Sequence, residues 1–425
     1  MRKKLYTALL TPSLRRAILG ATVLLPLLVL LAACSSEEPQ PGSTPSPSSP
    51  PAQQATATQV AQQGTATARP TTPTATPTIT PSPTAVPPLK QSNVVVVWEG
   101  DLWRVAGADQ QQRLTTNGGY SKPRWSADGQ RIAFVRGEGT RAELGVMNAD
   151  GSGRKMITTN NAEDTDPVWS PRMNTLAFTR TADTNGDGKV DVRDESEVWL
   201  VEADGSNPRY LATGHDPAWS PEGLRIAFAT NGILTDAPPY RRDNAIAIVN
   251  TKGENQWSLV SVAKLPTEVK LGDFVASPGT TVLKSPAWHP NGQYMAFTSE
   301  GHTGLVLTIS LRATDLKVID ARYEGGFGRA VWSPWGDVLA YEAFPPTGVD
   351  EIVVADGAGN RLGTIGGVRT GLSAVEPTWS PDGTYIAFAQ LEAEPYLAMA
   401  NIDGSNVKPL VWGRTRWPDW QPRGR

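Results

Sequence analysis

From Asn93 onward the chain repeats one short string, and this repeat constrains the fold more than any other feature. Each copy has a Trp, a turn similar to Ser-Pro-Asp-Gly and then a run similar to Ile-Ala-Phe; the Trp residues of the six full copies are Trp125, Trp169, Trp219, Trp288, Trp332 and Trp379. Counting Trp420, successive Trp residues lie 41 to 50 residues apart, except for one interval of 69. A period of this length indicates an array of similar supersecondary units.

Each unit is expected to consist of four antiparallel strands. In the turn, proline presets φ at the second position and glycine accepts the exit geometry, so the turn joins a strand that ends at Trp to one that begins at Ile-Ala-Phe. A third strand follows, as at Val198 to Val201, then a second turn such as Ala203-Asp-Gly-Ser206, then a fourth strand. Four antiparallel strands per repeat are typical of a β-propeller blade.

From Asn93 to the C-terminus the repeat closely resembles the WD-like repeat of TolB-type propellers, which implies an all-β fold closed by both chain ends. Before the first full copy, residues 94–97, 102–105 and 113–115 supply only second, third and fourth strands, while Pro418-Asp-Trp420 supplies a lone first strand. Pairing the two ends completes one blade and removes exposed sheet edges. We therefore expect seven blades. Six is the alternative, if the irregular region 257–284 displaces one.

The N-terminal residues 1–33 read as a secretory signal. Their apolar run, Ala17 to Leu31, has 15 residues and contains Pro26, whereas a spanning helix needs about 20. The run ends in Leu-Ala-Ala-Cys34, which resembles the bacterial lipobox. This resemblance implies cleavage before Cys34 and acylation of that residue, so we expect an extracytoplasmic protein lipid-anchored to the cell membrane or the outer membrane.

Residues 34–90 are expected to form a stalk, and residues 91–425 the propeller. The stalk consists almost entirely of Pro, Thr, Ser, Ala and Gln, which cannot bury enough apolar surface to offset the entropy of ordering. Five of the 39 basic residues precede Cys34, which leaves 34 basic and 42 acidic residues. This acidic balance disfavours nucleic acid as a partner. We expect a monomer.

A set of mostly polar residues precedes the first strand of each blade, where loops from the fourth to the first strand would converge on the channel mouth. We name this set the channel ring; it comprises Lys122, Asp166, Asp216, Ser285, Arg329, Glu376 and Trp417. The resemblance to TolB, whose channel mouth receives a lipoprotein partner, implies a docking site here. The alternative is an ordinary solvated rim.

One loop has the spacing of a calcium site. Residues 183–194 follow the pattern D-x-N-x-D-G through the twelfth position. Calcium prefers six or more oxygen ligands, and the candidates are Asp183, Asn185, Asp187, the Lys189 carbonyl, Asp191 and Asp194. The expected ion is structural. The alternative is an acidic surface loop without metal.

These features predict a membrane-anchored binding scaffold that docks an envelope protein, a peptide or a glycan. The alternative is a carbohydrate-active lyase or hydrolase that uses ring carboxylates such as Asp166, Asp216 and Glu376. No Gly-x-Ser-x-Gly nucleophile motif occurs in the sequence. The residues therefore favour a binding function over an enzyme.

Overall fold

The computed structural model describes residues 93–235, 241–242, 244–271, 274–277, 281–392 and 394–423. The expected signal, Cys34 and the stalk lie outside these residues. Within the described part of the chain, no helix is both long and apolar enough to cross a membrane.

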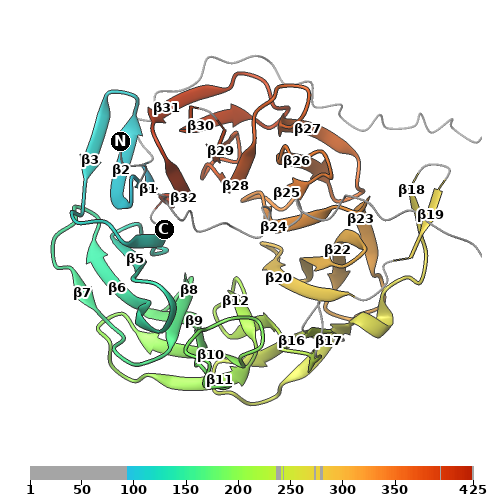
Figure 1. Ribbon diagram of the computed structural model, residues 1–425, viewed down its shortest axis with the longest axis horizontal. Coiled ribbons are helices and arrows are strands. Elements are labelled where there is room, and N and C mark those ends of the chain that lie inside the picture. The colour runs from blue at the N-terminus through green and yellow to red at the C-terminus, as the bar shows by residue number, and fades with distance from the viewer. Residues whose placement is uncertain are drawn as a thin grey trace, which may run out of the picture. The chain divides into compact units, whose positions relative to one another are not determined.

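Seven four-stranded antiparallel sheets form a ring, which confirms the seven-bladed propeller and excludes the six-bladed alternative (Figure 1). Blade 1 contains β4 (Tyr120–Trp125), β5 (Arg131–Arg136), β6 (Glu143–Asn148) and β7 (Lys155–Met156). Blade 2 contains β8 (Glu163–Trp169), β9 (Thr175–Thr181), β10 (Ser196–Glu202) and β11 (Arg209–Thr213). Blade 3 contains β12 (His215–Trp219), β13 (Arg225–Ala229), β16 (Ala245–Asn250) and β17 (Trp257–Ser261).

The remaining blades follow the same order from the inner to the outer strand. Blade 4 contains β20 (Val282–Trp288), β21 (Tyr294–Glu300), β22 (Thr303–Ser310) and β23 (Lys317–Tyr323). Blade 5 contains β24 (Gly326–Trp332), β25 (Val338–Phe344), β26 (Glu351–Asp356) and β27 (Arg361–Gly366). Blade 6 contains β28 (Ala374–Trp379), β29 (Tyr385–Gln390), β30 (Tyr396–Asn401) and β31 (Lys408–Trp412).

Blade 7 is built from both ends of the propeller, as expected. It contains β32 (Thr415–Trp420), β1 (Val94–Trp98), β2 (Asp101–Gly107) and β3 (Gln110–Arg113). The register pairs Val94 with Trp420 and Trp98 with Thr415. Next to this pairing, the Gln421 N–H donates to the Asn93 carbonyl at 2.7 Å. The closing strand thus removes the free edge of β1.

The long interval in the repeat belongs to blade 3 and the connection that follows it. A two-stranded hairpin, β14 (Ile233–Leu234) with β15 (Arg241–Arg242), interrupts the blade between its second and third strands. After β17 come a short 3-10 helix (Val262–Lys264) and a second hairpin, β18 (Val269–Leu271) with β19 (Phe274–Ala276), which projects outward in Figure 1. Another 3-10 helix spans Gly139–Arg141. These additions leave the count of seven blades unchanged.

The core lies between neighbouring blades. The second strand of each full repeat is buried on both faces, as at Ile132, Ala133 and Phe134 of β5, because a blade packs against each side. One hydrophobic cluster joins Phe134 of blade 1 to Val95 of blade 7, and another joins Leu144 of blade 1 to Phe178 of blade 2. Continuous apolar runs therefore replace the alternating pattern of a half-exposed strand.

Candidate functional site

Each innermost strand contains a β-bulge just before its Trp. In β4 the pairing with β5 shifts between Ser121 and Arg124, and in β12 the pairing with β13 shifts between His215 and Ala218. The other five inner strands shift at the equivalent point. In every case the inner strand has one residue more than its partner. Bulges of this kind re-aim side chains and are over-represented beside functional sites.

The channel ring occupies these seven bulges. The expectation that its residues lie in connecting loops is therefore wrong: they lie within the inner strands, because each first strand begins before the bulge. Six of the seven have left-handed backbones with φ between 48° and 59°, namely Lys122, Asp166, Asp216, Ser285, Glu376 and Trp417. A side chain in this region costs of order 1–3 kcal/mol, so the surrounding sheets must enforce the conformation.

Arg329 is the exception, and the residues on either side of it also differ from those of the other repeats. Its bulge contains Gly328, and Ala330 follows where the other blades have proline. A Cβ on Gly328 would meet Oε2 of Glu342 at 1.8 Å. The buried Glu342 carboxylate accepts the N–H of Arg329 at 3.0 Å and that of Glu376 at 2.6 Å. A buried acidic side chain here thus links blades 5 and 6.

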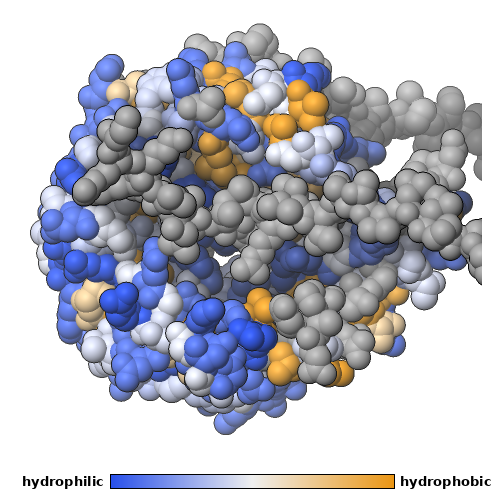
Figure 2. All heavy atoms as spheres, viewed as in Figure 1, coloured by the Kyte–Doolittle hydropathy of each residue, from blue (hydrophilic) through white to orange (hydrophobic). Residues whose placement is uncertain are grey.

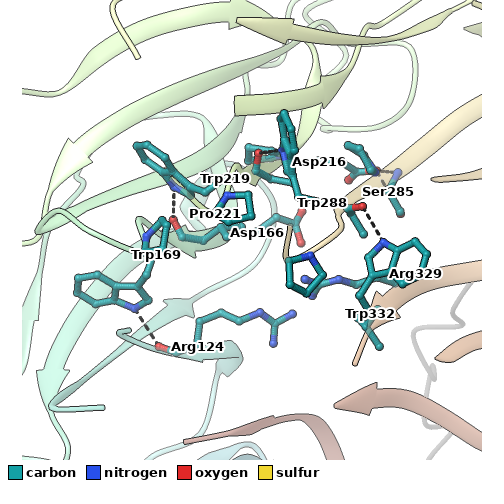
Figure 3. Close-up of a pocket in the computed structure, with 18 of the residues that line it drawn as sticks. Arg124, Asp166, Trp169, Asp216, Trp219, Pro221, Ser285, Trp288, Arg329 and Trp332 are labelled. Carbon is teal, nitrogen blue, oxygen red and sulfur yellow. Dashed lines mark hydrogen bonds between the residues drawn. The ribbon is translucent and has the colours of Figure 1, made fainter. Parts of the chain in front are cut away.

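Five ring residues line one cavity of 580 Å³ in the channel (Figure 3): Lys122, Asp166, Asp216, Ser285 and Arg329. Its walls also include the repeat Trp residues of blades 2 to 5 and a proline from each of the turns that follow them, Pro171, Pro221, Pro290 and Pro334. On the face drawn in Figure 2, hydrophilic residues predominate over the described blades and hydrophobic residues form only separate patches. The cavity is the place where polar and aromatic groups of several blades converge.

Glu376 and Trp417 do not line this cavity. One Glu376 carboxylate oxygen accepts the Trp417 N–H, and the other pairs with Arg416 at 2.6 Å. The Arg416 guanidinium lies 5.0 Å from the Trp417 ring centre, and the Trp417 ring packs against the core between blades 7 and 1. These two ring residues therefore join blade 6 to the closing strand.

Two of the three candidate catalytic carboxylates form an ion pair, and the third accepts hydrogen bonds. Asp166 pairs with Lys122 at 2.8 Å, and Glu376 pairs with Arg416. Burial acts to raise the pKa of Asp216, but His215 and the Ser285 N–H, which donates at 2.9 Å, outweigh it and hold the pKa well below its usual range. No hydrogen bond or ion pair joins two of these three carboxyls in the described chain. The lowered pKa of Asp216 is the opposite of the raised value that a general acid needs.

Arg124, which was not among the predicted site residues, is a third cation in the cavity, beside Lys122 and Arg329. It lies between the proline and the Trp of its repeat, where five other blades have Val168, Ala218, Ala287, Val331 and Thr378. Figure 3 shows Arg124 and Arg329 extending into the cavity from opposite walls. Of the seven repeats, only blade 1 and blade 7, with Asp419, have a charge at this position. That departure from the pattern could have identified Arg124 from the sequence.

The repeat Trp residues join successive blades. The Trp219 indole N–H donates to the Val168 carbonyl at 3.0 Å, one residue before the Trp of the preceding blade. Four others donate in the same way, from Trp169, Trp288, Trp332 and Trp379. Within the described residues, the indole N–H groups of Trp125 and Trp420 have no partner. Trp420 lies in blade 7 and Trp125 in blade 1, so the two exceptions fall at the two interfaces of the blade that closes the ring.

The candidate calcium loop connects β9 to β10, and its carboxylates cap backbone amides. Asp183 accepts the N–H groups of Gly186 and Gly188, both at 2.8 Å. The buried Asp194 accepts the N–H of Thr184 at 2.9 Å and that of Asp191 at 3.0 Å. Asn185 and Asp187 each accept the N–H two residues further on, at 2.9 Å.

The same loop contains a competing cation. The Arg193 guanidinium pairs with Asp187 at 2.7 Å and with Asp191 at 2.6 Å. Hydrogen bonds from Arg193 lower the pKa of Asp191 to about 2. Among the described His, Cys, Asp and Glu residues, no three are arranged to hold a metal ion. Calcium binding at Asp183, Asn185, Asp187, Lys189, Asp191 and Asp194 stays a prediction.

Comparison with known proteins identifies short segments similar to TolB. The Tol-Pal system protein TolB of Rhizorhabdus wittichii is 43% identical over 81 residues, which is 18% of this chain and 16% of that protein. TolB of Gluconobacter oxydans is 35% identical over 108 residues, covering 25% of this chain and 23% of that protein. The chain therefore spans less than a quarter of these relatives. No protein-family model matches the chain.

Solved structures share the fold at low sequence identity. The oligogalacturonate lyase of Vibrio parahaemolyticus is 11% identical, with a TM-score of 0.53 over 71% of this chain and 83% of that one. This likeness shows the architecture alone. Together with the repeat, the closure and the local TolB matches, it identifies the chain as a TolB-like, seven-bladed β-propeller.

Proposed function

We propose that this chain is an extracytoplasmic binding scaffold, acting as a monomer, that docks an extended segment of an envelope protein at the mouth of its channel. The proposal is carried by one observation: all seven inner strands contain a bulge before the repeat Trp, and five of these bulges contribute a ring residue to one cavity. Six of these bulges hold strained non-glycine residues. Strain of this kind clusters at ligand-binding sites.

The size of the cavity favours a segment over a folded partner surface. Ligand sites commonly enclose about 300–1,000 Å³, and this cavity of 580 Å³ has the room for a few side chains. The matched relatives are proteins of the Tol-Pal system, which supports a partner in the cell envelope. The ion pairs of Asp166 and Glu376 and the lowered pKa of Asp216 favour binding over acid–base catalysis.

A photo-crosslinking residue in place of Ser285 tests the docking site in the full chain in its native envelope. Ser285 lines the cavity, whereas Asp204, in the exposed turn between β10 and β11, provides the control position. We expect one defined protein adduct from position 285 and none from position 204. The same adducts from both positions, or none from position 285, would overturn the proposal.

We also propose that acylated Cys34 anchors the propeller to the membrane through the stalk at 35–90. Support comes from the Leu-Ala-Ala-Cys sequence and the short apolar run before it. Cys34→Ser is expected to abolish acylation and to release the protein or stall its processing, measured by mass spectrometry and membrane fractionation. Retention of a fully processed chain in the membrane without acyl mass on residue 34 contradicts the anchor.

A further inference from the structure

We propose that the channel cavity binds an acidic peptide segment by holding one of its carboxylates between the guanidinium groups of Arg124 and Arg329. This inference rests on the proposed docking function and specifies the chemistry of the ligand at that site. Both arginines line the cavity and extend into it from inner strands of different blades, β4 and β24 (Figure 3). A carboxylate between them can accept N–H bonds from both planar groups.

The two guanidinium groups are available to a ligand. Within the described residues, neither forms an ion pair. Among the residues that the structure describes, the only hydrogen bond from either guanidinium is that of Arg124 Nη1 to the adjacent Pro123 carbonyl, at 3.0 Å. Enclosure by the channel walls lowers the pKa of Arg329, as does Arg124, while Asp419, Asp166 and Asp216 oppose this effect. Arginine nevertheless stays protonated at neutral pH. Two like charges that face each other favour an anion between them.

The acidic residues of the cavity are already committed to other groups. Lys122 neutralises Asp166, and Asp216 is held by His215 and Ser285. Asp419 accepts the N–H of Trp125 at 2.7 Å. None of these carboxylates reaches either arginine as an ion pair. The charged residues that line the cavity are Lys122, Arg124 and Arg329 against Asp166 and Asp216, which leaves a net positive charge within a chain that has more acidic than basic residues overall.

The aromatic walls favour a peptide over a sugar chain. Sugars are recognised by exposed aromatic faces, but the indoles of Trp169, Trp219 and Trp288 are packed between blades and only 7–8% exposed. Their N–H groups are also bound to the neighbouring blade. What the walls offer a ligand is a set of indole edges and proline rings, together with the two cations.

Fluorescence anisotropy with a labelled peptide of alternating glutamate and serine tests the inference on the intact propeller. The matched peptide has glutamine in place of glutamate, and both have amidated C-termini. We expect the acidic peptide to bind at least tenfold more tightly than the neutral one, with affinity that falls as salt is added. Equal affinity for the two peptides overturns the inference.

Three variants locate the binding site. Arg329→Gln and Arg124→Gln should each lower the affinity for the acidic peptide at least tenfold. Arg329→Lys should lower it less than Arg329→Gln, because lysine keeps the charge but lacks the planar set of N–H donors. The control is Arg209→Gln on the outer strand β11, where the arginine does not line the cavity and donates to the Thr251 carbonyl at 2.6 Å. Unchanged melting temperatures exclude misfolding. Equal affinities in Arg329→Gln and Arg209→Gln contradict the site.

Two further results separate this inference from the docking function itself. If the partner captured through position 285 is still captured by the Arg124→Gln, Arg329→Gln double variant, the docking function stands and the carboxylate inference fails. If an oligogalacturonate displaces the acidic peptide and binds more tightly than it, the arginine pair serves a glycan and the peptide assignment is wrong.

Discussion

Gly328 in β24 packs so closely against Glu342 in the neighbouring strand β25 of blade 5 that a larger residue would displace the Glu342 carboxylate. A Cβ atom at position 328 would lie 1.8 Å from Glu342 Oε2, the oxygen that accepts the Arg329 N–H. The other carboxylate oxygen accepts the Glu376 N–H in the next blade. The glycine is therefore required by the buried carboxylate rather than by a left-handed backbone.

Gly328→Ala should lower the free energy of unfolding by about 1–3 kcal/mol, because the added methyl forces the carboxylate away from the two N–H groups. Urea denaturation measures the change. Gly357→Ala is the matched control, since a Cβ there has nothing within 4 Å. In a Gly328→Ala, Glu342→Ala double variant the loss should be smaller than the sum of the two single losses. Equal stability of the two glycine variants would contradict the proposed contact.

Two buried Trp residues differ in a way that isolates the indole hydrogen bond. The Trp219 indole N–H donates to the Val168 carbonyl, whereas the Trp125 indole N–H has no partner among the described residues; the exposures of the two residues are 7% and 5%. Trp→Phe removes the same volume at both positions. Trp219→Phe should cost about 1 kcal/mol more than Trp125→Phe, because only the first loses a buried hydrogen bond. Chemical denaturation of both variants decides the matter, and an equal or reversed cost would refute the inter-blade role.

The repeat made the architecture predictable, since each Trp, turn and Ile-Ala-Phe run is a local signal with a fixed strand assignment. The closing blade was also predictable, because Val94 to Val97 lacks a first strand and Pro418 to Trp420 supplies one. The hairpin of β18 and β19 was visible only as a long interval. No local sequence signal distinguishes an insertion that follows a complete blade from one that disrupts a blade.

The ring residues were predictable by position but not by conformation. Lys122, Ser285 and Trp417 share no side-chain property that favours left-handed backbone, so the bulge is imposed by the sheet and the following proline. Cross-blade contacts depend on tertiary placement. For that reason the sequence could not show that Glu376 lies outside the cavity or that its carboxylate accepts the Trp417 N–H.

The pH dependence of stability should carry the signature of Asp419. Burial raises the pKa of this carboxyl above its ordinary value of 3.8, although Arg124, the Trp125 N–H and Arg329 counteract it. A carboxyl whose pKa is raised in the folded state contributes its full stabilisation when the pH is below its pKa in the unfolded chain. This contribution is lost as the pH rises through the folded-state pKa. Asp419→Asn keeps an oxygen for the Trp125 N–H and removes the titration. The variant should therefore lose less stability than the wild type between about pH 4 and pH 7.

Asp101→Asn should show the opposite trend and serves as the control. Burial acts to raise the pKa of Asp101, but hydrogen bonds from Arg113, Gly118 and Thr115 outweigh it, and the pKa is lowered. Its stabilising effect is present above the unfolded pKa and is lost as the pH falls through the folded value. Melting curves from about pH 2 to pH 7 compare the two variants, because the pKa of Asp101 is lowered below its ordinary value of 3.8. A parallel response in both would show that neither carboxyl dominates the pH dependence.

Calcium should compete with Arg193 for the loop at 183–194, and the competition gives the metal prediction a sharp test. Arg193 already neutralises Asp187 and Asp191, so we propose that calcium binds weakly, in the range of about 10⁻⁴–10⁻³ M common for extracellular modules. Calcium that binds only the folded state raises the free energy of unfolding by about 2.7 kcal/mol at a concentration a hundredfold above Kd, and the melting temperature rises with it. Arg193→Ala should tighten binding by removing the competing cation. Asp187→Ala should abolish most of the calcium-dependent shift, whereas Asp128→Ala, in an ordinary blade turn, should leave it intact. Calorimetry and melting curves, with calcium and with chelator, measure calcium binding by the wild type and the three variants. Identical curves and no binding heat, even in Arg193→Ala, would contradict the prediction that this loop binds calcium.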